Sequence, residues 1–280
     1  MKNQIYPCLW FDGEARAAAD LYCDVFGNSK ILEDNTMIVS FELHGQKFIG
    51  LNGGPMYKPN PSVSFFVVFE RKPEADRAWN MLLEGGSVLM PLDSYPWSER
   101  YGWLQDRFGV NWQLSFGKMQ DVGHKVSPLL MFTGEQFGKA EQAVHFYTSL
   151  FDGSSVDGIL KYSAEDNDEE GKVKHAQFKL GDQVFMAMES SMDHQFTFSE
   201  GISFVVDCDT QEEIDYYWGK LTGDGGQESM CGWLKDKYGV SWQIVPSILP
   251  RLLADPSRSD KVVQAFMKMK KFNIQALLEA

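Results

Sequence analysis

The chain contains one segment twice. Residues 102–114 read GWLQDRFGVNWQL, and residues 232–244 read GWLKDKYGVSWQI. Eight of these thirteen positions are identical, and most of the others keep the type of side chain, so Trp103 corresponds to Trp233 at an offset of 130 residues. Two tryptophans at the same spacing in both copies argue against chance. The sequence therefore predicts a tandem duplication, which constrains the fold more than any local propensity does.

Three further matches occur in the same order in both halves. They pair residues 21–26 with 146–151, 41–48 with 177–184, and 63–68 with 202–207. Each copy is thus about the size of a whole domain. We expect a first domain over residues 1–119, a second over 125–250 and a helical extension over 251–280. The polar linker between the domains is short, which favours docked copies over separate beads.

Charge and composition exclude several classes of partner. The net charge of −13 repels a phosphate backbone, so we expect no nucleic acid. No apolar run reaches the roughly 18 residues of a membrane span, and residues 1–7 carry no apolar signal region, so we expect no membrane. The four cysteines stand at unrelated spacings, which is typical of reduced thiols in a cytoplasmic protein. The acidic run over 165–170 lacks the spacing of a calcium loop and is expected to be a solvated loop.

The hydrophobic pattern predicts the order strand, helix and three strands, and this order occurs twice in each copy. In the first unit, apolar residues 5–11 predict a strand, and Ala15, Ala18, Ala19, Tyr22 and Phe26 form the apolar face of a helix. Four such βαβββ units make an α+β fold and disfavour a doubly wound nucleotide-binding sheet. After residue 250, Val262, Val263, Phe266 and Met267 predict a helix packed across both domains.

Several segments resemble one family. They are residues 7–13 (PCLWFDG), 51–55 (LNGGP), 231–236 (CGWLKD), 242–246 (WQIVP) and the tail over 267–278. The chain resembles the PhnB-like branch of the vicinal oxygen chelate (VOC) superfamily, which includes glyoxalase I, bleomycin-resistance proteins and extradiol dioxygenases. This branch is also labelled 3-demethylubiquinone-9 3-methyltransferase. The resemblance implies that two βαβββ units wrap into a half-open barrel around a small-molecule pocket, so we expect two tandem barrels. Single-domain PhnB-like proteins generally pair, which implies an intramolecular pseudo-dimer.

The resemblance also locates four metal-ligand positions, which in the superfamily's enzymes hold His, Glu or Gln. In this sequence those positions read, for the first and second copies, Pro7 and Pro128, Gly50 and Met186, Ser64 and Ser203, and Gln113 and Gln243. Proline and glycine offer no side-chain donor, and serine is a poor neutral ligand. We therefore expect no metal and no cofactor in either pocket.

The remaining pocket candidates are aromatic and polar. The predicted ligand-binding residues are Phe11, Asn52, Ser64, Phe66, Trp103, Asn111 and Gln113 of the first copy and Gln243 of the second. Met188, Phe204 and Trp233 are further candidates in the second copy. Aromatic walls with a few amides suit a flat or apolar small ligand. For Gln113 and Gln243, pocket lining and structural capping remain equal alternatives. His175 is the only histidine placed to face a pocket, and we expect it to be structural.

The sequence does not identify the ligand or decide whether the protein is an enzyme. A methyltransferase of the common fold needs a glycine-rich turn between a strand and a helix, and neither residues 50–55 nor 222–226 provides one. We expect a metal-independent small-molecule binder. The alternatives are a metal-dependent enzyme of the glyoxalase or dioxygenase type, and a scaffold with vestigial pockets. A retained site is expected in the first copy, which has the LNGGP segment and a loop over 91–97 that forms an aromatic lid or fills the domain junction.

Overall fold

The computed structural model describes residues 3–280 and contains two mixed sheets of eight strands each. Sheet A has the order β14-β15-β16-β13-β1-β4-β3-β2, and sheet B has the order β10-β11-β12-β9-β5-β8-β7-β6. The strands of sheet A are β1 (Ile5–Phe11), β2 (Ser29–Asp34), β3 (Ile38–Leu43), β4 (Gln46–Asn52), β13 (Ile202–Cys208), β14 (Gln227–Glu228), β15 (Trp233–Lys235) and β16 (Ser241–Pro246). Those of sheet B are β5 (Val63–Phe69), β6 (Ser87–Tyr95), β7 (Ser98–Gln105), β8 (Asn111–Phe116), β9 (Val126–Phe132), β10 (Ser155–Lys161), β11 (Val173–Leu180) and β12 (Gln183–Glu189).

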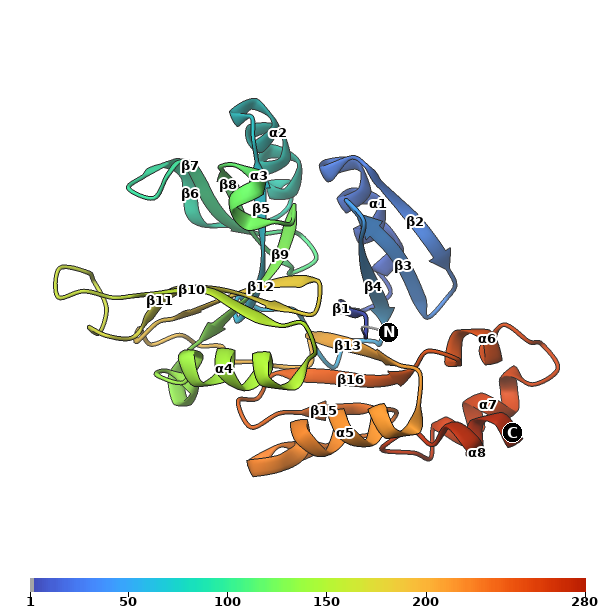
Figure 1. The fold of residues 1–280 in the computed structure, drawn as a ribbon. Coiled ribbons are helices and arrows are strands. Elements are labelled where there is room, and N and C mark those ends of the chain that lie inside the picture. The colour runs from blue at the N-terminus through green and yellow to red at the C-terminus, as the bar shows by residue number, and fades with distance from the viewer. Residues whose placement is uncertain (1–2) are drawn as a thin grey trace.

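Four helices follow the opening strands of the four units and flank the sheets (Figure 1). They are α1 (Ala15–Phe26), α2 (Lys72–Leu83), α4 (Ala140–Leu150) and α5 (Gln211–Thr222). Shorter helical segments are α3 (Met119–Val122), η1 (Gly134–Gln136) and η2 (Gly223–Gly225). The predicted series of four βαβββ units is therefore confirmed. Within residues 3–280, no helix is both long enough and apolar enough to cross a membrane.

Each sheet takes one unit from each copy. In sheet A, β1 of the first copy pairs antiparallel with β13 of the second, with Cys8 opposite Ser203. In sheet B, β5 pairs antiparallel with β9, with Ser64 opposite Leu129. The expectation that both units of a barrel come from the same copy is thus wrong. Backbone hydrogen bonds join the two copies edge to edge, and each sheet is a composite.

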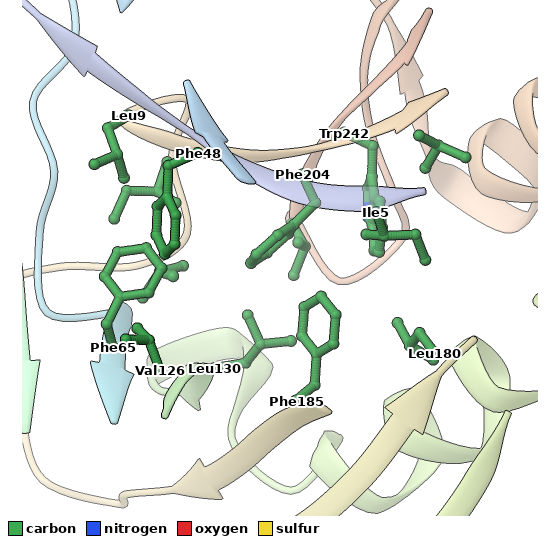
Figure 2. Packing of buried hydrophobic residues seen from close by; sticks show 14 of the residues in the cluster. Ile5, Leu9, Phe48, Phe65, Val126, Leu130, Leu180, Phe185, Phe204 and Trp242 are labelled. Atoms are coloured by element: carbon green, nitrogen blue, oxygen red, sulfur yellow. The ribbon is translucent and has the colours of Figure 1, made fainter. Parts of the chain in front are cut away.

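Within each copy, the two units pack face to face through a hydrophobic core. Figure 2 shows Leu9, Phe48 and Phe204 of sheet A pointing toward Phe65, Leu130 and Phe185 of sheet B. The ring centroids of Phe48 and Phe65 are 5.4 Å apart in the first copy, and those of Phe185 and Phe204 are 5.0 Å apart in the second. Burying each such side chain contributes roughly 1.5–3 kcal/mol. The core therefore lies between the two sheets, and we call the opposite surface of each sheet its far face.

A buried carboxylate ties the two units of each copy together. In the second copy, Asp236 accepts hydrogen bonds from Tyr147 Oη (2.7 Å) and Trp242 Nε1 (2.8 Å). It also accepts the backbone N–H groups of residues 238 and 240. Asp106 of the first copy accepts the equivalent four bonds, from Tyr22, Trp112 and two backbone groups. This network explains why Asp, Gly and Trp recur at one spacing in both copies.

The C-terminal segment forms three short helices, α6 (Leu249–Leu253), α7 (Ser259–Phe266) and α8 (Ile274–Glu279). They lie at one end of the molecule beside α5 and β16, and not across both sheets as their apolar residues predicted (Figure 1). The backbone N–H groups of Cys231 and Gly232 donate to the carbonyls of Met269 and Lys270, both at 2.7 Å. In the first copy, strand β7 is the equivalent of β15, and β6 pairs with the edge of β7 that corresponds to the edge contacted here. The hairpin of β14 and β15 is shorter, and the C-terminal segment takes the place of the missing strand.

Separating the copies should leave two sheet edges without partners. We expect residues 1–122 alone to self-associate or to unfold at a lower temperature than the whole chain, because β1 and β5 lose their partners β13 and β9. Light scattering after gel filtration and a thermal melt test this. A soluble monomer as stable as the whole chain would contradict it.

Breaking the buried carboxylate network should destabilise the fold. Asp236→Asn replaces an accepting oxygen by an N–H donor and leaves two buried donors without a partner, each costing ~1–3 kcal/mol. Tyr147→Phe removes one bond to a charged group and should cost ~1.5–3 kcal/mol. Chemical denaturation should rank Asp236→Asn as the more damaging change, with exposed Asp12→Asn near the parent. Equal stability of all three variants would show that the network contributes nothing.

Candidate functional site

The far face of sheet B brings together five of the eight predicted ligand-binding residues. Strand register places Trp103 opposite Gln113, Gln113 beside Phe66, and Phe66 opposite Ser127, in one row across four strands. The neighbouring row contains Asn111, Ser64, Leu129 and Met186. The first copy supplies one half of this face and the second copy supplies the other. A site on this face therefore belongs to a sheet and not to one copy.

Gln113 is held from both ends of its amide. Tyr101 Oη donates to Gln113 Oε1 at 2.7 Å, and Gln113 Nε2 donates to Ser64 Oγ at 2.9 Å. Gln243 donates in the same way to Ser203 Oγ at 2.9 Å on sheet A. Both glutamines therefore lie on the far faces, where they bond to neighbouring side-chain hydroxyl groups and not to the backbone groups that the capping alternative expected.

The second copy surrounds this polar line with apolar and sulfur-containing side chains. Leu129, Met131 and Met186 are buried and Met188 is partly exposed, and the first copy adds the partly exposed Phe66. His175 of β11 pairs with Leu160 of β10, the edge strand of sheet B. Burial lowers the pKa of the His175 imidazole, which favours its neutral form. The face therefore combines thioethers and an aromatic ring with neutral hydrogen-bonding groups.

The segment expected to be a lid belongs to a hairpin. Residues 91–95 belong to β6, and the chain turns at Pro96 and Trp97 into β7. Trp97 is exposed and stacks on Tyr95 with ring centroids 5.1 Å apart. Both rings contact Tyr101, the residue that holds Gln113, at 5.7 Å. The hairpin tip thus forms an aromatic rim beside the Tyr101 end of the far face.

Two predicted residues lie elsewhere. Phe11 is buried in the core, where its ring meets Phe108 at 6.2 Å. Asn52 Oδ1 accepts the backbone N–H of Ala15 at 2.9 Å, so it caps helix α1, and its Nδ2 donates to the carbonyl of Thr36. Glu189 makes the equivalent bond to Ala140 in the second copy. Glu189, and not the candidate Met188, is therefore the second-copy equivalent of Asn52.

The glycines after Asn52 serve a neighbouring side chain. A Cβ at Gly53 would lie 2.2 Å from the indole of Trp10, and Trp10 Nε1 donates to the carbonyl of Gly54 at 2.7 Å. The space left by the missing side chain of Gly53 is therefore filled by the indole of Trp10.

Three of the eight residues read at the metal-ligand positions, Pro7, Gly50 and Pro128, face the core and not the far faces. Pro7 pairs with the core residue Phe204, and Gly50 faces Ala15, so Cys8 and Ile49 are the far-face residues of sheet A there. On sheet B the corresponding far-face residues are Leu129 and Met186. Met186, Ser64, Ser203, Gln113 and Gln243 lie on the far faces as expected.

The donors at these positions do not fit a divalent cation. On sheet A they are a thiol, two neutral polar groups and an aliphatic side chain, and burial raises the pKa of the Cys8 thiol to about 12, so it stays protonated. On sheet B they are a hydroxyl, an amide, a thioether and a leucine. Among residues 3–280, no three His, Cys, Asp or Glu side chains are grouped to hold a metal ion, and all four cysteines are free.

The far face of sheet A has a different chemistry. Tyr6 Oη donates to Asp207 at 2.8 Å, and Lys47 Nζ lies 3.9 Å from the same carboxylate. Trp10 and Trp233 meet edge to face at 5.8 Å. The second-copy candidates are divided, because Trp233 and Gln243 pair on this face while Phe204 lies in the core. Sheet A therefore presents ionised groups near its centre, whereas Ser64, Phe66, Gln113 and Ser127 near the centre of sheet B are neutral.

Three grooves lie away from the Trp103 and Asn111 rows of sheet B. The first, of about 630 Å³, is lined by Trp10, Tyr57, Arg107 and neighbouring loops, and the second, of about 570 Å³, by His44, His124 and adjacent strand ends. The third, of about 560 Å³, lies between α2 and the hairpin residues Pro91 and Leu92. Of the predicted ligand-binding residues, only Phe11 lines the first groove and none lines the second.

Comparison with known proteins supports the duplication and the fold. The family model described as 3-demethylubiquinone-9 3-methyltransferase matches residues 3–115 and again residues 124–245. A PhnB protein from Bacillus cereus is 31% identical, and the match covers 40% of this chain and 98% of that one, with a TM-score of 0.38. Glyoxalase I from Zea mays is 13% identical over 87% of this chain and 93% of its own, with a TM-score of 0.58, which shows a shared fold. A search of curated proteins finds no match.

The capping role of Asn52 can be separated from ligand binding. We expect Asn52→Ala to lower the free energy of unfolding by ~0.5–2 kcal/mol, the usual cost of a lost helix cap, and to leave small-molecule affinity unchanged. Denaturant unfolding and a binding titration measure the two effects. A variant that kept the parent's stability but lost binding would show that Asn52 is a ligand-binding residue.

Proposed function

Because the chain belongs to the 3-demethylubiquinone-9 3-methyltransferase family, with one family match in each copy, we propose that it is a PhnB-like small-molecule binder of the VOC fold. Binding uses the far face of sheet B and needs no metal ion. The observation that carries this proposal is the single row of Trp103, Gln113, Phe66 and Ser127, built from both copies.

The composition of the row supports binding by packing and a few directed hydrogen bonds. Small-molecule sites in proteins are mostly apolar with a small number of placed polar groups, and this face has that balance. Unbranched thioether side chains change rotamer at little cost, so Met188 and the buried Met131 and Met186 can move aside for a ligand. Phe66 is partly exposed and offers a flat surface for entry.

The donor sets argue against the metal-dependent alternative. Neutral hydroxyl, amide and thioether groups are weak ligands for the divalent cations that activate water or polarise a carbonyl. The methyltransferase in the family's description also lacks support in this chain. A nucleotide-type methyltransferase sheet is mainly parallel with alternating helices, whereas here hairpins of antiparallel strands dominate both sheets. A scaffold with vestigial pockets predicts no ligand and is separated from our proposal by experiment.

Metal dependence is tested by elemental analysis of protein purified without chelators. We expect far less than one zinc, nickel or iron ion per chain, and an unchanged melting temperature in the presence of a chelator, because neither far face offers a charged donor set. One bound metal ion per chain would contradict the proposal that binding needs no metal.

The location of the site is tested with a matched pair of variants. Met188 and Leu51 occupy equivalent far-face positions of sheets B and A, and both are partly exposed. In a thermal-shift screen of uncharged aromatic compounds, Met188→Glu should abolish the shift by placing a carboxylate among apolar groups, and Leu51→Glu should preserve it. The reverse result would move the site to sheet A, and no shift with any compound would favour the vestigial scaffold.

A further inference from the structure

Three buried polar atoms on the far face of sheet B lack a hydrogen-bond partner. They are Trp103 Nε1, Asn111 Oδ1 and Ser127 Oγ, and their residues are 8% exposed for Trp103 and fully buried for the other two. Within residues 3–280, five buried side-chain polar atoms are unpaired, so most of them gather on this one face. Folded proteins seldom leave such groups unpaired, which indicates that a further molecule satisfies them.

The orientation of the Asn111 amide is fixed by its surroundings. Its Nδ2 donates to the carbonyl of Gly109 at 3.0 Å, and only the NH₂ end can make that bond. The oxygen is therefore the end that is left free. Trp103 Nε1 is a donor without acceptor capacity, so the face presents one free acceptor and one free donor, with a hydroxyl that can serve as either.

Strand register places these atoms around a common area. Trp103 and Ser127 stand at the two ends of one row across β7, β8, β5 and β9, with Gln113 and Phe66 between them. Three strand spacings of about 4.8 Å separate their backbones by roughly 14 Å, a span that an indole and a one- or two-ring ligand fill. Asn111 lies two residues from Gln113 on β8, in the adjacent row.

The side chains next to the three unpaired atoms favour an uncharged ligand. The row of Trp103 and the row of Asn111 contain no ionised side chain on β7, β8, β5 or β9. On the four matching strands of sheet A, the Asn111 row has a lysine, Lys235 of β15. On sheet B, Lys179 lies farther out on β11, where it pairs with Val184 and contacts Asp157. An ion among Leu129, Phe66 and the methionines would lose its hydration without a partner, whereas a neutral molecule would not.

Building on the proposed function, we propose that the far face of sheet B binds an uncharged planar lactam or imide. Its carbonyl oxygen accepts from Trp103 Nε1, its ring N–H donates to Asn111 Oδ1, and Ser127 Oγ takes a further polar group of the ligand. A lactam carries a donor and an acceptor on neighbouring atoms of one flat ring. Its two faces pack against the Phe66 ring and the methionine thioethers.

Three probes of nearly equal size test this on the full chain by calorimetric titration. The compound 2-quinolinone carries both the N–H and the carbonyl, 1-methyl-2-quinolinone lacks the N–H, and quinoline lacks both groups. We expect 2-quinolinone to bind about tenfold more tightly than either of the others, because each of them leaves a buried protein group unpaired.

Two substitutions assign the hydrogen bonds. Trp103→Phe keeps an aromatic ring and removes the indole N–H, so the preference for 2-quinolinone over quinoline should fall to the part that the N–H bond to Asn111 supplies. Trp233→Phe makes the same change at the matching position of sheet A and should leave that preference intact. Asn111→Ser introduces the residue that sheet A has at this register, Ser241, and should remove the preference over the N-methyl compound.

The outcomes separate this inference from the proposed function. If all three probes bind equally and Trp103→Phe changes nothing, the lactam assignment is overturned while an apolar binding site remains. If none of the probes binds, both the lactam assignment and the small-molecule site on sheet B fail. If binding is strong but is lost with Trp233→Phe and retained with Trp103→Phe, the recognition lies on sheet A.

Discussion

The buried carboxylate of each copy is the interaction on which the rest of the structure depends. Asp236 links the helix of one unit, through Tyr147, to the turn and the tryptophan of the other unit. Burial raises its pKa to about 6, and the four donated hydrogen bonds oppose that rise. Asp106 does the same in the first copy, where burial also raises the carboxyl pKa. The carboxylate holds the two units of each copy face to face. The first strand of each unit then lies at an edge of that unit, and these edge strands pair with those of the other copy.

Edge pairing between copies explains why both far faces are composite. Because β1 pairs with β13 and β5 with β9, a far face always combines an opening unit of one copy with a closing unit of the other. The polar line through Gln113 and the methionines around it therefore come from different copies. Neither copy alone contains a complete face, although each contains its own core.

The sequence predicted the elements well and the faces of the strands less well. Repeats and apolar spacing located the helices and central strands, and polar residues flanked by large apolar ones, such as Ser64 and Gln113, were placed on the correct face. In β1 every residue from 5 to 9 is buried, so alternation does not show which residues face the core, and Pro7 was assigned to the metal-ligand position that Cys8 occupies. Asn52 was misread because its partner, Ala15, lies 37 residues away. The pairing of units was not predictable, since four similar units joined by short connections allow either arrangement.

Fusion of the two copies removes a symmetry that would constrain a dimer of identical chains. In such a dimer, both composite faces would contain the same residues, and a change that favoured a ligand on one face would appear on the other. Here the two faces have diverged at matching positions, with Leu129 against Cys8, Met186 against Ile49 and Asn111 against Ser241. The shared serine–glutamine bond is retained on both. Since that bond is common and the surrounding residues are not, we infer that the bond maintains the geometry of each face, while the residues around it determine what each face can bind.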